Sequence, residues 1–255
     1  MRNKVDLHVT LPPMKCGILI IGSLYWDDAN GRADWRKDRL STSASIPVRA
    51  PIYYGRKSRS RGDTYTMTFR GNDPSGVATL VPCLREIERI EDLKDEAAAL
   101  WKAEAPQSRS GAIGSGWGCV GALLGSDEAR ESLGRAWNAH FRKIRGEGLS
   151  VVGPGGELDL AWPETVTGQP ADMDIILATA TLPEAEPPTA QTLADAWLGQ
   201  NGGYERYFLE NIRHGIRTVH DLEIWRCIEA GTPGWVETDG YREAVEVLRG
   251  EEQGR

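Results

Sequence analysis

The sequence predicts an α+β fold, with strands concentrated in the first half of the chain and helices in the second. An unbroken apolar run, 16–24, is typical of a buried strand. Apolar residues recur at helical spacing in 87–104, and the pattern after 174–181 is helical. Strands and helices do not alternate regularly along the chain, which argues against a doubly wound sheet of the Rossmann type.

The other expected strands follow from apolar patterns and their boundaries. In 64–69, threonines alternate with Tyr65, Met67 and Phe69, which is the period of two of a half-buried strand. The segment 153–156 is expected to form a turn between two short strands. The remaining expected strands are 46–54, 76–81, 117–124 and 174–181.

Helix boundaries are indicated by capping residues and prolines. Pro106 is expected to end helix 87–104, because the residue before a proline avoids the helical conformation. Ser126 is expected to cap a second helix, which is acidic in its first turn and basic in its last, an order that complements the helix dipole. Thr218 and Asp221 resemble a capping box. Further helices are expected in 189–199, 204–212 and 239–248, and 31–40 is expected to be a loop or a short helix.

Charge and hydropathy exclude some classes of partner. The chain has 255 residues and a formal net charge of −7, and its acidic residues are spread along it. Binding of nucleic acid requires a basic face, so this charge argues against a nucleic-acid partner. The longest apolar run, 17–21, is too short to cross a bilayer, so no membrane partner is expected. A short basic run is expected to be a solvated loop, and it consists of Arg56, Lys57, Arg59 and Arg61.

The histidines and cysteines indicate no metal centre. The segment 1–15 lacks the apolar core of a secretory signal, so a cytoplasmic location with free thiols is expected. Neither residue type has the spacing of a metal site, and we expect no metal or other cofactor. Cys119 is expected to be a buried thiol rather than a nucleophile. The residues considered are Cys16, Cys83, Cys119, Cys227, His8, His140, His214 and His220.

The first candidate for function is the loop Gly22-Ser23-Leu24, which directly follows the first buried strand. A glycine there lets the backbone turn so that successive N–H groups point outward, an arrangement that can hold a carboxylate or a phosphate. A plain turn is the alternative interpretation. The aromatic residues Tyr204, Tyr207 and Phe208 are expected to be core rather than site.

The second candidate is Glu104, which follows Ala97, Leu100 and Trp101 on the apolar face of the expected helix. Loss of solvent and the helix C-terminus both favour a neutral carboxyl, which suits a group that transfers protons. The alternative is a helix end that frays at Pro106 and leaves the carboxylate in water.

Four segments, in the same order, resemble those of gamma-glutamylcyclotransferase-like proteins, especially the ChaC type. Segment 21–26 is similar to their Tyr-Gly-Ser-Leu-x-Trp loop, although Ile21 replaces the tyrosine. Segment 100–104 is similar to their Leu-Trp-x-x-Glu motif, and 76–82 to the Gly-Val-x-x-x-Val-Pro strand before it. Segment 207–211 resembles their Tyr-Leu-x-Asn segment, and Gly215-Ile216 with His220-Asp221 resembles the Gly-Ile-x-Asp that follows it. Pro106 and the Ser/Gly-rich 108–116 replace a Gly-Gly-Tyr, and 125–168 has no counterpart.

The resemblance implies a closed mixed β-barrel flanked by helices, with a helix-hairpin insertion and a helical C-terminal part. The implied organisation is an arm at 1–15, one domain at 16–250 with the insertion at 125–168, and a tail at 251–255. The implied activity is that of a lyase of glutathione metabolism, which releases 5-oxoproline from a gamma-glutamyl amine or peptide without a cofactor. In the implied site, Glu104 shuttles the proton, and Gly22, Ser23 and Leu24 hold the glutamyl α-carboxylate, with Tyr25 as a further substrate-binding residue.

Two other functions are compatible with the same sequence. A non-catalytic module on the same fold would bind a small amino-acid-like ligand; Glu104 favours the enzyme, and the loss of the tyrosine at Ile21 favours the binding module. A protein-interaction role would use the amphipathic helix of the 125–168 insertion. The oligomeric state stays open.

Overall fold

The structure of the protein is a computed structural model that describes residues 11–58, 62–71, 75–199, 205–231 and 233–253. It has the predicted α+β class. The strands are β1 (Cys16–Ile20), β2 (Ile46–Ala50), β3 (Ile52–Ser58), β4 (Thr64–Phe69), β5 (Gly76–Pro82), β6 (Gly114–Ser115), β7 (Gly118–Leu124) and β8 (Ile175–Thr181). The α-helices are α1 (Arg32–Arg39), α2 (Ile90–Glu104), α3 (Asp127–Ile144), α4 (Ala190–Leu198), α5 (Glu205–Arg213), α6 (Asp221–Ala230) and α7 (Arg242–Gln253).

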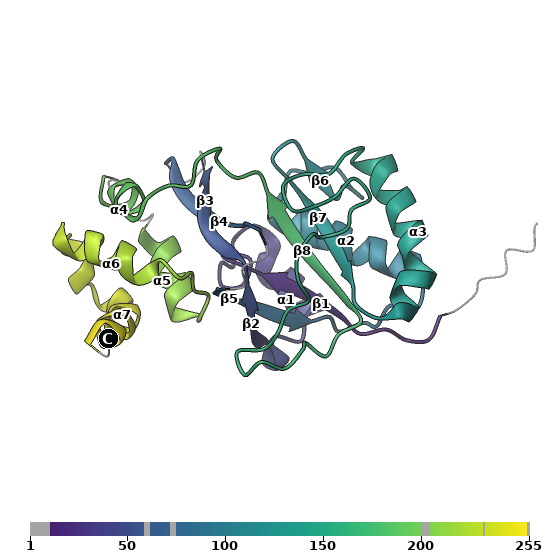
Figure 1. Ribbon diagram of the computed structural model, residues 1–255, viewed down its shortest axis with the longest axis horizontal. Coiled ribbons are helices and arrows are strands. Elements are labelled where there is room, and N and C mark those ends of the chain that lie inside the picture. The colour runs from purple at the N-terminus through teal and green to yellow at the C-terminus, as the bar shows by residue number, and fades with distance from the viewer. Residues whose placement is uncertain (1–10, 59–61, 72–74, 200–204, 232, 254–255) are drawn as a thin grey trace, which may run out of the picture.

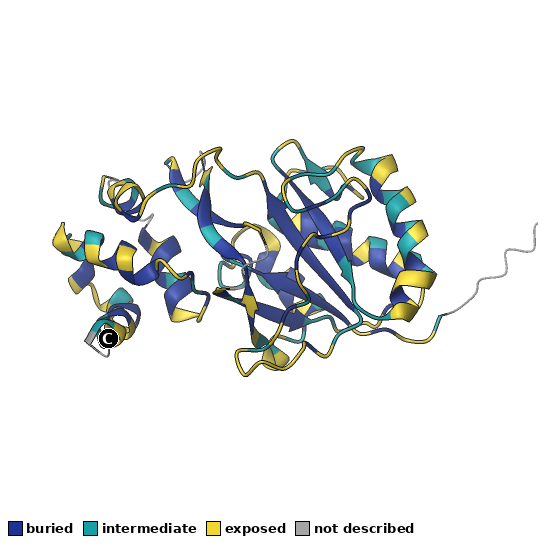
Figure 2. Cartoon of the chain, in the orientation of Figure 1, coloured by how far each residue is buried: buried dark blue, intermediate teal, exposed yellow. Residues whose placement is uncertain are grey.

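Six of these strands form one mixed sheet in the order β2-β5-β1-β8-β7-β6. The central strands β1 and β8 are parallel, and the other neighbouring strands are antiparallel. Every residue of β1 and β8 is buried, which explains why both appear in the sequence as continuous apolar runs (Figure 2). β1 ends at Ile20, so the loop that follows it begins at the middle of the sheet.

A proline divides the strand that the sequence predicted as 46–54. Pro51 has no N–H to give to a ladder, and the chain changes partners there. β2 pairs with β5, whereas β3 pairs with β4 in a separate two-stranded sheet. The hairpin approaches the main sheet at Thr68, whose hydroxyl donates to the carbonyl of Thr181 at the end of β8 (2.9 Å).

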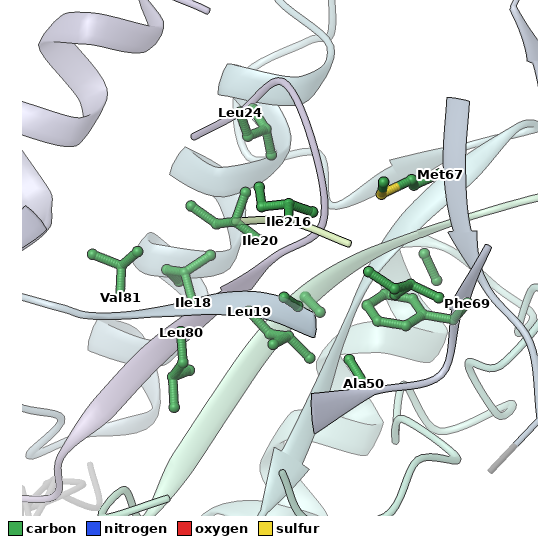
Figure 3. Packing of buried hydrophobic residues seen from close by; sticks show 14 of the residues in the cluster. Ile18, Leu19, Ile20, Leu24, Ala50, Met67, Phe69, Leu80, Val81 and Ile216 are labelled. Atoms are coloured by element: carbon green, nitrogen blue, oxygen red, sulfur yellow. The ribbon is translucent and has the colours of Figure 1, made fainter. Parts of the chain in front are cut away.

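The core joins these two sheets. Buried residues of β1, β4 and β5 belong to one core cluster that covers both faces of the main sheet. In Figure 3, Ile18 and Val81 lie on one face and Leu80 on the other. α2 and α3 lie at one end of the molecule, and α4–α7 gather at the other, beyond the β3–β4 hairpin (Figure 1). The pocket described below lies between these ends.

The predicted helix boundaries are largely confirmed. The hydroxyl of Ser126 accepts from the N–H of Ala129 (3.2 Å) at the start of α3, and Thr189 accepts from the N–H of Thr192 (3.1 Å) at the start of α4. α2 ends at Glu104, two residues before Pro106. The segment 31–40 contains α1, a short helix.

The structure differs from the expected organisation in two places. After α3, the segment 145–168 contains a turn at 153–156, but its flanks meet only through isolated bridges such as Val152 with Leu158, not through two strands. α7 continues to Gln253 and therefore includes the first residues of the expected tail. There, Glu251 and Glu252 form ion pairs with Arg217 and Arg226, respectively. Residues 1–10 of the expected arm lie outside the described residues.

None of the helices within the described ranges combines the length and the apolar character that crossing a lipid bilayer requires.

Candidate functional site

A small cavity of about 50 Å³ lies where the loop after β1 meets the C-terminal end of α2. Gly22, Ser23, Leu24 and Glu104, which the sequence analysis selected, all line it. The two predicted motifs, about eighty residues apart in sequence, therefore share one pocket. The rest of the wall includes Arg56 from β3, Thr66 and Met67 from β4, Thr179 and Thr181 from β8, and Tyr207 from α5.

The loop is a tight turn that leaves some of its N–H groups unused. The N–H of Tyr25 donates to the carbonyl of Gly22 (3.0 Å), and the N–H of Asp27 donates to the carbonyl of Ser23 (2.9 Å). No described residue accepts a hydrogen bond from the N–H of Gly22 or Leu24. Leu24 extends from the loop toward Ile20 and Ile216, which anchors the turn in the core (Figure 3). The turn can therefore offer backbone donors to a carboxylate.

Gly22 is required by the close approach of a side chain. A Cβ at position 22 would lie 2.4 Å from the hydroxyl oxygen of Tyr207. That hydroxyl also accepts a hydrogen bond from the N–H of Met67 in β4 (3.1 Å). Tyr207 is buried in the core, as predicted, and it also connects the loop to the β3–β4 hairpin, a role that the sequence did not reveal. In the sequence, the only indication of this role was that Tyr207 begins segment 207–211, one of the four segments that resemble the family.

The loop also packs directly against α5. The indole N–H of Trp26 donates to the side-chain oxygen of Asn211 (2.8 Å), and the Trp26 ring lies edge-on to Tyr207 with 6.0 Å between ring centroids. Tyr207 and Asn211 are four residues apart, so they share one face of α5. The first and last segments of the resemblance therefore meet in space.

Two arginines of α1 hold the loop in place. Arg36 donates to the carbonyls of Leu24 (2.7 Å) and Asp27 (3.1 Å). Arg32 forms an ion pair with Asp27 (2.6 Å) and donates to the carbonyl of Ala103 (3.1 Å), next to Glu104. Both arginines are buried, and Arg32 ties the loop to the last turn of α2. Their burial is not evident from the sequence, because 31–40 has the pattern of a polar segment.

Glu104 differs from the other inward-facing glutamate of α2. Glu96 is buried and pairs with Arg39 (3.0 Å) and Arg85 (3.4 Å), and burial raises the pKa of its carboxyl despite these partners. Glu104 is only half-buried, so the expected loss of solvent is partial. Within the described residues, no hydrogen bond or ion pair engages its carboxylate. The group is therefore available to a ligand in the cavity.

The basic run is not one solvated loop, which corrects the expectation from the sequence. Arg56 and Lys57 belong to β3, whereas Arg59 and Arg61 lie outside the described residues. Arg56 is half-buried, lines the cavity, and places its guanidinium 4.5 Å from the centre of the Trp117 ring. It gives the cavity wall a cation.

Tyr25, predicted as a substrate-binding residue, is not among the residues that line the cavity. Its hydroxyl lies 3.1 Å from that of Ser45, and its ring contacts His214 edge-on with 5.6 Å between centroids. Tyr25 therefore contacts Ser45 and His214 outside the cavity lining.

The other candidates lie elsewhere. Cys119 is buried in β7, and burial raises the pKa of its thiol, which disfavours the nucleophilic thiolate. The chain has four free cysteines. Across the described ranges, no group of three or more His, Cys, Asp or Glu side chains is placed to hold a metal ion. His8 and Tyr204 lie outside the described residues.

A second cavity, of about 510 Å³, lies between the β3–β4 hairpin and the N-terminal ends of α4 and α6. Tyr53, Pro187 and Leu193 are among its mainly apolar lining residues, with Arg70 and His220 as its basic groups. It is much larger than the first. The smaller cavity is nevertheless the better candidate, because it combines unused backbone donors with a carboxylate that no described residue pairs with.

Comparisons of the chain with protein-family models, with curated proteins and with solved structures find no match. The function is therefore inferred from the residues and their geometry.

Proposed function

We propose that the protein is a gamma-glutamylcyclotransferase-like enzyme that releases 5-oxoproline from a gamma-glutamyl amine or peptide. The observation that supports this most is the shared cavity of the Gly22–Leu24 loop and Glu104. The reaction is intramolecular, so the protein has only to hold the substrate in a reactive conformation and to move one proton. A carboxylate beside a set of backbone donors meets both needs.

In the proposed mechanism, the N–H groups of the loop bind the α-carboxylate of the glutamyl group, and the positive charge of Arg56 favours this anion. The α-amine nitrogen then attacks the γ-carbonyl carbon, and the new C–N bond closes a five-membered ring. Glu104 takes a proton from the attacking nitrogen and gives it to the leaving nitrogen as the original C–N bond breaks. The products are 5-oxoproline and a free amine or peptide.

The size of the cavity limits how the substrate is held. At about 50 Å³, the cavity is far smaller than sites that enclose a whole ligand, which are roughly 300–1,000 Å³. We therefore propose that it receives the glutamyl carboxylate end and that the leaving group extends toward solvent. Such a site would accept leaving groups of different sizes.

We also propose that the two sheets together form the closed barrel of this family. The hydrogen bond from Thr68 to Thr181 supports this, because it brings the free side of the β3–β4 hairpin to β8. The four free cysteines favour a cytoplasmic enzyme, since the cytoplasm keeps thiols reduced.

The test is an assay of 5-oxoproline release from a panel of gamma-glutamyl amines and peptides by the full chain and by Glu104→Gln. An amide keeps the shape of the carboxylate but cannot take up a proton, so we expect the rate to fall by about a hundredfold or more. The melting temperature should hold or rise, because Glu104 has no partner among the residues that the structure describes and lies at a helix C-terminus.

Glu96→Gln is the matched control on the same helix. It removes a paired, buried carboxylate away from the cavity, so we expect a lower melting temperature and an unchanged rate. An active wild type that Glu104→Gln leaves unaffected would exclude Glu104 from the mechanism. A wild type that forms no 5-oxoproline but melts at a higher temperature with a gamma-glutamyl compound would be a binding module instead.

A further inference from the structure

Threonines of β4 and β8 lie at or near the cavity, and they fall into two classes according to whether the hydroxyl has a hydrogen-bond partner. On β4, the hydroxyl of Thr66 donates to the carbonyl of Arg56 (3.3 Å), and that of Thr68 donates to the carbonyl of Thr181 (2.9 Å). On β8, the hydroxyl oxygens of Thr179 and Thr181 are buried, and among the described residues neither has a hydrogen-bond partner. The two β8 residues are 8% and 7% exposed and both line the cavity.

Two unpartnered hydroxyls on one wall require an explanation. Burying a hydroxyl without a partner destabilises the folded state, and a valine of the same shape would avoid that cost. Thr179 and Thr181 are two residues apart on β8, so both face the same side of the strand, whereas Ala178 and Ala180 face the other. Because both side chains form part of the cavity wall, rotation about their Cα–Cβ bonds can turn both hydroxyls toward a ligand atom.

The proposed reaction has one polar atom that still lacks a partner. The loop binds the α-carboxylate, and Glu104 handles the proton. The γ-carbonyl oxygen accepts hydrogen bonds and becomes negatively charged when the amine nitrogen adds to the carbonyl carbon, because the π electrons move onto oxygen. Neutral donors aimed at such an oxygen stabilise it selectively as the charge develops.

We propose that the hydroxyls of Thr179 and Thr181 donate to the γ-carbonyl oxygen of the substrate and stabilise the oxyanion formed during ring closure. This inference rests on the proposed function. When the intermediate collapses, the C=O bond re-forms, the bond to the leaving nitrogen breaks, and the proton on Glu104 moves to that nitrogen. The two threonines keep their own protons throughout.

The experiment compares Thr179→Val, Thr181→Val and the double variant with wild type, using gamma-glutamylalanine or, if another compound of the panel has a higher kcat/KM, that compound. We expect kcat to fall by about a hundredfold in the double variant, the scale of one lost oxyanion donor, with KM changed only a few-fold. The melting temperature should hold or rise, because unpartnered hydroxyls are replaced by methyl groups. Thr179→Ser and Thr181→Ser keep the hydroxyl and should retain most of the activity.

Thr68→Val is the matched control, since its hydroxyl has a structural partner and Thr68 does not line the cavity. We expect it to lower the melting temperature and to leave kcat unchanged. An active wild type whose kcat survives both valine substitutions would overturn this inference and leave the proposed function intact. Valine variants that lose stability and rate together, as a structural role requires, would also overturn it. A wild type that forms no 5-oxoproline would overturn both.

Discussion

The cavity beside the sheet and the helical end of the molecule, formed by α4–α7, differ in how their charged groups are paired. At the helical end, arginines of α5, α6 and α7 and of the segments between them are paired with carboxylates across elements. At the cavity beside the sheet, Glu104 is unpaired within the described residues, and the loop carries unused N–H groups. The pairs at the helical end are Arg213 with Glu243, Arg217 with Glu251, Arg226 with Glu252 and Arg249 with Glu229.

The comparison supports the proposal that the cavity carries the chemistry and that α4–α7 support it. Contacts of α5 and of Arg217 are among those that join the two. Tyr207 and Asn211 of α5 contact the loop, and Arg217 exchanges two backbone hydrogen bonds of 2.8 Å with Val77 of β5. Substitutions in α4–α7 should therefore mainly lower the free energy of unfolding, whereas substitutions at the cavity should mainly lower the turnover rate.

The largest effect on stability is expected from Arg217→Met. Arg217 bridges Asp221 (2.9 Å), which is almost fully buried, and Glu251 (2.7 Å). Removing the arginine leaves Asp221 as a buried charge without its cation, which costs about 3–5 kcal/mol of unfolding free energy. Arg226→Met breaks the more exposed pair with Glu252 and should cost about 1 kcal/mol or less. Urea unfolding measures both, and equal losses would contradict the special role of Arg217.

A smaller effect is expected from Gly22→Ala, at the junction of the two ends. The added methyl group would meet the Tyr207 hydroxyl at 2.4 Å, so overpacking should cost about 1–3 kcal/mol and lower turnover. Combining it with Tyr207→Phe removes the clashing atom and should recover part of the stability. Gly134→Ala, in α3, meets no atom closer than 3.6 Å and should be neutral or stabilising. A Gly22→Ala variant as stable as wild type would show that the loop is free to move.

The smallest effect is expected from pH. Burial lowers the pKa of His140, in α3, and of His214, after α5, so each binds its proton less readily in the folded state. The unfolded state then binds more protons, and stability should fall as the pH drops below about 6.5 through the lowered pKa values of the folded protein. Urea unfolding at a series of pH values checks this. His140→Gln and His214→Gln should each make the free energy of unfolding depend less on pH. Variants with the same pH dependence as wild type would show that these two histidines do not cause it.

The sequence predicted elements where local chemistry decides them. Ser126 and Pro106 set helix ends by hydrogen bonding and by steric exclusion, both of which act within a few residues. The Gly22–Leu24 loop and Glu104 were identified from residue patterns. Their meeting in one cavity involves α1, whose Arg32 bonds both to Asp27, after the loop, and to Ala103 in the last turn of α2.

Long-range features were not predictable in the same way. The polar pattern of 31–40 does not reveal that Arg32 and Arg36 are buried, since this depends on which carbonyls the fold brings near. The change of partner at Pro51 depends on the pairing of β2 with β5, far along the chain. Thr179 and Thr181 appear in the sequence only as polar residues of a buried strand. Only the folded structure, in which β4 lies beside β8, shows that their hydroxyls have no partner among the described residues.

The central claim is that the Gly22–Leu24 loop and Glu104 form one substrate site. A crystal structure of Glu104→Gln with a gamma-glutamyl dipeptide bound tests it most directly, because this variant should bind the dipeptide without converting it. We predict the α-carboxylate at the N–H groups of the loop, and the α-amine at about 2.6–3.2 Å from the side chain of residue 104. A dipeptide bound instead in the larger cavity between the β3–β4 hairpin and α6 would contradict the claim.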